Sequence, residues 1–133
     1  MNRMSPVLLF VDTEPFTDLQ DTLQLKDRTT HVIQVGSAAE CLKLAMEKKI
    51  GVAVVSDQLP DISGIQLVNL LKKMKPDLEI IFTTSCHEPQ KEIDARLAGI
   101  LYYAVKPVDW SLLGQVIEKA LTRQSEKIAL TNQ

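Results

Sequence analysis

Short apolar runs alternate along the chain with segments whose apolar residues recur at the spacing of a helix. An apolar run of strand length that is rich in β-branched or aromatic residues predicts a β-strand. The run at residues 31–35 alternates and carries Gln34, which predicts a strand more exposed than the others. The predicted strands are residues 7–11, 31–35, 52–55, 80–82 and 102–105.

The segments between these runs predict helices. Ser37 is placed to cap one of them, and Glu40, three residues later, predicts a capping box with it. Ser63 begins another helix, and Asp109 caps the last one. Residues 15–25 and 89–98 are further candidates, each with a proline near its start, where proline is tolerated. The helix residues expected to face the core are Cys41, Leu42, Ala45, Met46, Leu67, Val68, Leu71, Met74, Leu112, Leu113, Val116, Ile117, Ala120 and Leu121.

The strict alternation of strands and helices predicts the fold class. Parallel strands need long crossover connections, which are right-handed, so this order indicates an α/β domain with a parallel sheet covered on both faces. Ligands of such sheets bind beyond the carboxyl ends of the strands. The residues that follow the strands at that edge are Asp12, Thr13, Glu14, Asp57, Thr84, Ser85, Lys106 and Pro107.

The carboxylates, hydroxyls and ammonium at this edge suit a divalent cation and a phosphoryl group. Mg²⁺ prefers one or two carboxylates together with waters and phosphate oxygens. The Thr84 hydroxyl can donate to one phosphate oxygen, and Lys106 can pair with another. An aspartate can itself attack phosphorus and form an acyl phosphate. Phosphoryl transfer needs mainly positioning and charge neutralisation, which such a set of residues can provide.

Composition narrows the functional classes. The 133 residues have a net charge of −2, which gives no indication of nucleic-acid or membrane binding. Cys41 and Cys86 lie in apolar sequence, so we expect buried free thiols in a reducing compartment. His31 and His87 lack metal-ligand spacing and are expected at the surface. Without a transmembrane-length apolar run or a signal peptide, the protein is expected to be cytoplasmic.

Four segments together resemble the receiver domain of bacterial two-component response regulators, from residue 7 to residue 121. They are VLLFVDTEP, VVSD followed by LPDISG, IIFTTS and AGILYYAVKP. The resemblance implies a flavodoxin-like three-layer sandwich with a doubly wound sheet of strand order 2-1-3-4-5. We expect one receiver domain at residues 1–121 and a short tail at residues 122–133. That tail is too short for an effector domain, so the chain is either a single-domain regulator or part of a longer protein.

The resemblance also assigns roles to the residues at the sheet edge. It implies that a histidine kinase or phosphotransfer protein phosphorylates Asp57, that Thr84 contacts the phosphoryl group, and that Lys106 pairs with it. Asp12 and Asp57 would hold Mg²⁺, and Glu14 is an additional candidate ligand.

The resemblance also implies how the domain passes its signal to a binding partner. Tyr103 falls at the family's switch aromatic above Thr84, and Pro107 would follow a cis peptide bond. Output would pass through the face formed by residues 89–98, residues 102–105 and the helix after Asp109. An unidentified downstream protein or a second copy of the chain would bind there, without direct nucleic-acid or membrane binding.

Two positions depart from the family pattern. Thr13 stands where the family usually has a second acid that ligates the metal, which predicts weakened Mg²⁺ binding. Only Gln58 and Leu59 separate Asp57 from Pro60, where the family usually has three residues. Counting back from Pro60 would place Ser56 at the acceptor position. We favour Asp57, because a loop absorbs a deletion more easily than a buried strand absorbs a shift of register.

These departures keep other functions open. A degenerate receiver would be a protein-interaction module that works without phosphorylation, as the threonine and the short loop suggest. The D-T-E sequence faintly resembles the D-x-D motif of phosphatases that form an aspartyl-phosphate intermediate. This chain, however, lacks the second aspartate and the cap insertion of such enzymes. A flavin carrier would need a hydroxyl-rich phosphate loop after the first strand. Only Thr13 and Thr17 offer hydroxyls there, and the neighbouring acidic residues would repel the phosphate.

Overall fold

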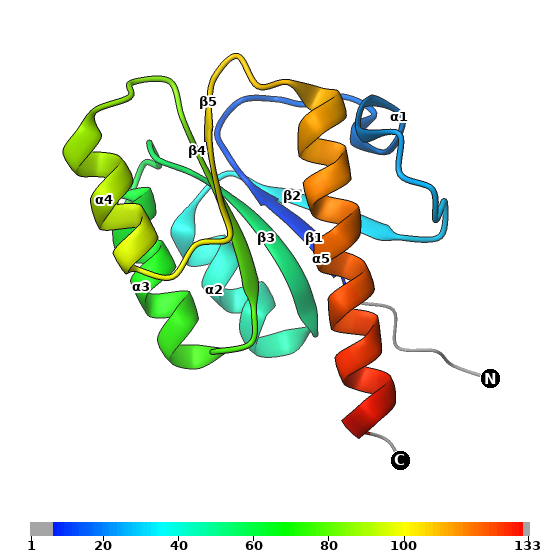
Figure 1. Cartoon of the computed structure of the whole chain (residues 1–133). Coiled ribbons are helices and arrows are strands. Elements are labelled where there is room, and N and C mark those ends of the chain that lie inside the picture. The colour runs from blue at the N-terminus through cyan, green and yellow to red at the C-terminus, as the bar shows by residue number, and fades with distance from the viewer. Residues whose placement is uncertain (1–6, 132–133) are drawn as a thin grey trace.

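The strands form one parallel sheet between two layers of helices in the computed structural model, which describes residues 7–131 (Figure 1). The strand order β2-β1-β3-β4-β5 confirms the order that the resemblance implies. Each predicted strand is present, and β3 and β4 are longer than predicted because Ile50, Ser56 and Thr83 continue the pairing beyond the predicted ends. The strands are β1 (Val7–Val11), β2 (His31–Val35), β3 (Ile50–Ser56), β4 (Glu79–Thr84) and β5 (Tyr102–Val105).

The helices cover both faces of the sheet, as a doubly wound fold requires. One face packs against α1 (Leu19–Leu23) and α5 (Trp110–Thr131). The other packs against α2 (Ala38–Glu47), α3 (Gly64–Met74) and α4 (Pro89–Leu97). No helix within residues 7–131 is both long enough and apolar enough to cross a membrane.

Neighbouring residues of a strand point to opposite faces, and β3 shows this clearly. Val54 belongs to the apolar core beneath α1 and α5, whereas Val55 belongs to the core beneath α2, α3 and α4. The same alternation directs Ser56 toward the α1 and α5 side and Asp57 toward the α3 and α4 side. The two candidate acceptor residues therefore occupy different environments.

Side-chain caps begin the longer helices, but one of them differs from the prediction. The Ser37 hydroxyl accepts from Glu40 N at 3.2 Å, whereas the Glu40 carboxylate accepts from Gly36 N and from the Ser37 hydroxyl instead of Ser37 N. The predicted capping box is therefore wrong. A complete box forms at α3, where Ser63 and Gln66 exchange both hydrogen bonds. Asp109 caps α5 as predicted, accepting from Leu112 N at 3.1 Å.

Two helix lengths differ from the predictions. The first helix spans only Leu19–Leu23, because Asp18 and Gln24 on either side adopt left-handed conformations, with φ of 55° and 54°. The last helix continues without a break beyond Leu121 to Thr131. Gln124 in this extension is buried, and its side-chain amide donates to the carbonyls of Gly51 and Asp77.

Three residues predicted to face the core are exposed instead: Met46, Met74 and Leu112. Their exposed fractions are 78%, 43% and 43%. Met46 and Leu112 are each one position away from a buried neighbour, Ala45 and Leu113, and one residue turns a helix by about 100°. Met74 is the last residue of α3. An apolar residue beside the buried stripe can thus face solvent.

The prediction that both cysteines are buried is correct for Cys41 and wrong for Cys86. Burial raises the pKa of the Cys41 thiol to about 12, which suppresses the reactive thiolate. Cys86 lies exposed in the loop between β4 and α4.

We expect iodoacetamide at neutral pH to alkylate the folded protein once, at Cys86, and to reach Cys41 only after denaturation. Peptide mass mapping measures this, with Cys86→Ser as the control; rapid labelling of Cys41 in the folded state would contradict it.

Candidate functional site

Polar side chains gather where the strands end at the carboxyl edge of the sheet. Asp12 follows β1, Asp57 follows β3, Thr84 ends β4 and Lys106 follows β5. The hydrogen bonds divide them into two groups, one on each side of the sheet. Asp12 contacts Lys106 on the α1 and α5 side, and Asp57 contacts Thr84 on the α3 and α4 side. We name them the Asp12 group and the Asp57 group.

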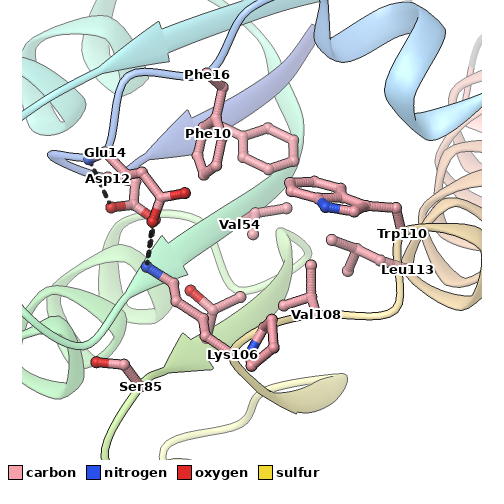
Figure 2. Close-up of a pocket in the computed structure, with 12 residues that line it drawn as sticks. Phe10, Asp12, Glu14, Phe16, Val54, Ser85, Lys106, Val108, Trp110 and Leu113 are labelled. Carbon is pink, nitrogen blue, oxygen red and sulfur yellow. Dashed lines mark hydrogen bonds and ion pairs between the residues drawn. The ribbon is translucent and has the colours of Figure 1, made fainter.

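The Asp12 group is built around a largely buried ion pair (Figure 2). Lys106 Nζ lies 2.8 Å from Asp12 Oδ2 and 3.4 Å from Ser56 Oγ. Asp12 Oδ1 accepts from Glu14 N at 3.0 Å, so both oxygens of this carboxylate have partners. The Glu14 carboxylate is mostly exposed and reaches Lys106 only at 3.9 Å. The ammonium group of Lys106 is therefore bound to Asp12 and Ser56 in this structure.

An aromatic cavity of about 350 Å³ adjoins the Asp12 group. Phe16 packs edge-on against Phe10 and Trp110, with ring centroids 5.7 and 5.5 Å apart. Asp12, Glu14 and Lys106 form its polar side, as Figure 2 shows. The Asp12–Lys106 pair therefore lies at the polar side of a largely apolar cavity.

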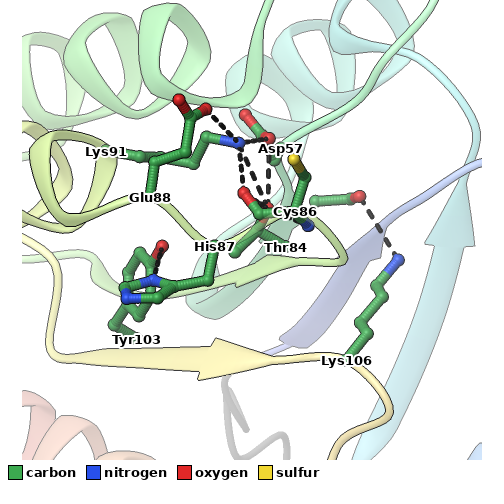
Figure 3. Close-up of polar contacts among 9 residues, drawn as sticks. Asp57, Thr84, Cys86, His87, Glu88, Lys91, Tyr103 and Lys106 are labelled. Carbon is green, nitrogen blue, oxygen red and sulfur yellow. Dashed lines mark hydrogen bonds and ion pairs between the residues drawn. The ribbon is translucent and has the colours of Figure 1, made fainter.

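The Asp57 group contains a residue that sequence reasoning missed, Lys91 of α4 (Figure 3). Lys91 Nζ lies 2.7 Å from Asp57 Oδ2, 2.6 Å from the Cys86 carbonyl oxygen and 3.7 Å from a Glu88 carboxylate oxygen. Thr84 Oγ1 also lies 3.2 Å from Asp57 Oδ2. The hydrogen bond to Asp57 raises the pKa of Lys91, and desolvation opposes it in part. One oxygen of Asp57 is therefore covered by an ammonium group and a hydroxyl.

The loop after Asp57 is held by contacts with backbone groups. Gly64 N donates to the Asp57 carbonyl oxygen at 2.8 Å. The Asp61 carboxylate accepts from Ala38 N at 3.0 Å and from Ala39 N at 2.8 Å. These two amides belong to the first turn of α2, whose own first N–H groups have no partner within the helix. These hydrogen bonds hold the loop at Asp57 and at the start of α2.

Asp61 should make the stability of the folded domain depend on pH. Its bonds from Ala38 N and Ala39 N lower the pKa of the folded carboxyl below its ordinary value of 3.8. The stabilisation is therefore present above the unfolded pKa and disappears as the pH falls through the folded pKa. We expect Asp61→Asn to be less stable than wild type at pH 7, with a smaller difference at pH 3. Urea unfolding at both pH values tests this, and an equal difference at both would contradict it.

The family model of the response regulator receiver domain matches residues 8–118. The chain belongs to this family. Receiver domains are generally signalling modules of two-component systems that accept a phosphoryl group on an aspartate and bind Mg²⁺ at that site.

Individual relatives are distant in sequence and close in fold. The transcriptional regulatory protein GlrR of Escherichia coli K12 is 26% identical over 125 residues, which cover 94% of this chain and 28% of GlrR. The activator DevR/DosR of Mycobacterium tuberculosis is 32% identical over 100 residues, covering 75% of this chain and 46% of that protein. The chain thus spans less than half the length of either relative. The crystal structure of a CheY-like receiver domain protein from Methanospirillum hungatei JF-1 has a TM-score of 0.77 at 25% identity, covering 92% of this chain and 98% of that one.

Tyr103 of this receiver domain lies at the back of the Asp57 group. Its ring is buried and stacks on Phe82, with centroids 5.8 Å apart. Its hydroxyl lies 2.9 Å from Nδ1 of His87, whose ring is exposed as predicted (Figure 3). Burial raises the pKa of Tyr103. The inward ring thus links β5 to the loop that follows Thr84. The Lys106–Pro107 peptide bond is cis.

Asp12 and Asp57 are the receiver domain's candidate metal ligands. They follow β1 and β3, which pair directly, and two carboxylates with waters suit Mg²⁺. The two carboxylates are therefore suitable ligand types for the ion, and binding requires the ammonium groups of Lys91 and Lys106 to move away. Within residues 7–131 no three His, Cys, Asp or Glu side chains are placed to share a metal, so Glu14 does not join the two aspartates.

Proposed function

We propose that Asp57 accepts a phosphoryl group from a histidine kinase or phosphotransfer protein and that the domain then signals through its surface. The observation that carries this proposal is the Asp57 group itself. A carboxylate at the end of β3 accepts a hydrogen bond from Thr84, and its other oxygen has no hydrogen-bond partner among the described residues. An unpaired carboxylate oxygen is the nucleophile that acyl phosphate formation needs.

The residues of the site have distinct tasks in this reaction. An Asp57 oxygen attacks phosphorus, and the bond between phosphorus and the donor's leaving atom breaks. The Thr84 hydroxyl turns from the carboxylate to a phosphoryl oxygen, and Lys106 leaves Asp12 to pair with another. Mg²⁺ held by Asp12 and Asp57 would neutralise charge on the phosphoryl group. Tyr103 behind Thr84 would pass this local change to β5 and α4.

The output surface that we propose is the face of α4, β5 and α5. Ile93, Leu97 and Val105 are exposed there, with fractions of 51%, 81% and 46%. Such apolar residues suit the binding of a downstream protein or of a second copy of the chain.

We further propose that Mg²⁺ binds weakly, because the neutral Thr13 replaces an acidic ligand. A charge-assisted contact contributes about 1.5–3 kcal/mol, which corresponds to roughly tenfold to hundredfold in affinity. Intact-mass measurement after incubation with acetyl phosphate, over a series of Mg²⁺ concentrations, tests both proposals. We expect one phosphoryl adduct that needs high Mg²⁺ in wild type and less in Thr13→Asp.

The second candidate function is an interaction module that works without phosphorylation. It is favoured by the pairing of both aspartates with lysines, Asp12 with Lys106 and Asp57 with Lys91. If wild type takes up no phosphoryl group at saturating Mg²⁺, and Thr13→Asp does not restore uptake, this second function replaces the first.

A further inference from the structure

The ammonium group of Lys91 occupies the space directly beside the acceptor carboxylate. Its closest partners are Asp57 Oδ2 and the Cys86 carbonyl oxygen, at 2.7 and 2.6 Å, and Thr84 Oγ1 lies at 3.5 Å. Only 15% of the Lys91 side chain and 14% of the Asp57 side chain are exposed. This lysine is therefore no solvated surface residue: a cation carried by α4 already neutralises Asp57.

The position of this ammonium conflicts with metal binding. A divalent cation on Asp57 would bring like charges together at the distance of a salt bridge, and such repulsion is strong where water is scarce. The Asp57 oxygen bound to Lys91 also accepts from Thr84, so it has little remaining capacity for a metal. Lys91 must leave Oδ2 if that oxygen is to coordinate an ion.

A second partner for the displaced ammonium already lies within reach. Glu88, one helical turn before Lys91, has a carboxylate oxygen 3.7 Å from Nζ and is 66% exposed. A small movement toward solvent would exchange Asp57 for Glu88 while keeping Lys91 paired. The same movement would break the bond to the Cys86 carbonyl oxygen, which ties the start of α4 to the site.

We propose that Lys91 is an intramolecular counter-ion of Asp57 that Mg²⁺ must displace before Asp57 can be phosphorylated. The proposal rests on the proposed function, and it assigns to Lys91 a large part of the weak Mg²⁺ binding that Thr13 alone would otherwise explain. The proposal also links Mg²⁺ binding at Asp57 to the first turn of α4, because Lys91 would lose its hydrogen bond to the Cys86 carbonyl oxygen.

Calorimetric titration of the unphosphorylated protein with MgCl₂ tests the competition. We expect Lys91→Gln to bind Mg²⁺ about tenfold to hundredfold more tightly than wild type, the range for loss of a charge-assisted contact. Lys91→Arg keeps the cation and should keep the weak binding. Lys73→Gln is the matched control, because it removes the same charge from an exposed position at the far end of α3 and should change affinity less than twofold. Equal Mg²⁺ affinity in Lys91→Gln and wild type would overturn the proposal.

Amide hydrogen exchange gives a second test that uses wild type alone and holds even if Lys91→Gln folds poorly. Saturating MgCl₂ should accelerate exchange at residues 86–92, because the displaced lysine releases the start of α4. Unchanged exchange there, with Mg²⁺ bound, would also overturn the proposal. Neither test uses a phosphoryl donor. A protein that passes both but takes up no phosphoryl group would refute the proposed function while leaving the role of Lys91 intact.

Discussion

Replacing Asp57 with alanine should abolish phosphoryl uptake from acetyl phosphate, whereas replacing Ser56 with alanine should leave uptake in place. An acyl phosphate requires a carboxylate, and the Ser56 hydroxyl cannot form one. The alternation along β3 also turns Ser56 away from Asp57, because its hydroxyl lies 3.4 Å from Lys106 in the Asp12 group. Only Asp57 shares an environment with Thr84.

Intact-mass spectrometry at saturating Mg²⁺ measures both variants. Asp57→Asn is the matched control, since it keeps the shape of the side chain and removes the nucleophilic charge, and it should also take up nothing. Urea unfolding establishes whether each variant remains folded. A persistent adduct in Asp57→Ala, or loss of the adduct in a folded Ser56→Ala, would contradict the assignment of Asp57 as the acceptor.

The sheet could be predicted because its signals are local. Continuous apolar runs mark the buried strands, and the alternating run with Gln34 marks β2, which lies at the sheet edge and is the most exposed strand as predicted. The helix boundaries were harder, because they depend on single residues. Neither Asp18 nor Gln24 is a glycine, the usual signal of a left-handed conformation, and no residue near Leu121 marks how far α5 continues.

The site could be predicted only as a set of residues at one edge. The sequence places Asp12, Asp57, Thr84 and Lys106 after strands, and the structure has all four there. Which of them touch depends on the face that each side chain takes, and this separates Asp12 with Lys106 from Asp57 with Thr84. Lys91 carries no signal of its own, because a lysine on a predicted polar helix has the pattern of a solvated residue.

The loop between Asp57 and Gly64 begins where β3 ends, and the strand keeps its pairing up to that point. Ser56 still pairs with Thr83, and Asp57 N donates to the Thr83 carbonyl oxygen at 2.8 Å, so β3 keeps its register to its end. Beyond that point, α3 approaches the end of β3 closely. Gly64, the first residue of α3, makes that approach through its backbone.

Gly64→Ala should therefore destabilise the domain and disturb Asp57 together. A Cβ at position 64 would overlap the Ser56 carbonyl oxygen and lie 2.8 Å from Asp57 Cα. Both are backbone atoms, which cannot turn aside as a flexible side chain can. Overpacking of this kind typically destabilises by about 1–3 kcal/mol. Relief requires α3 to move away from β3, which stretches the bond from Gly64 N to the Asp57 carbonyl oxygen and shifts Asp57.

Urea unfolding measures the loss of stability, and acetyl phosphate uptake at saturating Mg²⁺ measures the shift of Asp57. Gly36→Ala is the matched control, because a Cβ there would meet its nearest neighbours, Glu40 Oε1 and the Asp12 carbonyl oxygen, at 3.9 and 4.0 Å. Those are ordinary contacts, so Gly36→Ala should keep both stability and uptake near wild type. If Gly64→Ala matches Gly36→Ala in both measurements, α3 does not press against the backbone of Asp57. The loop after Asp57 would then hold the acceptor in position without a glycine at position 64.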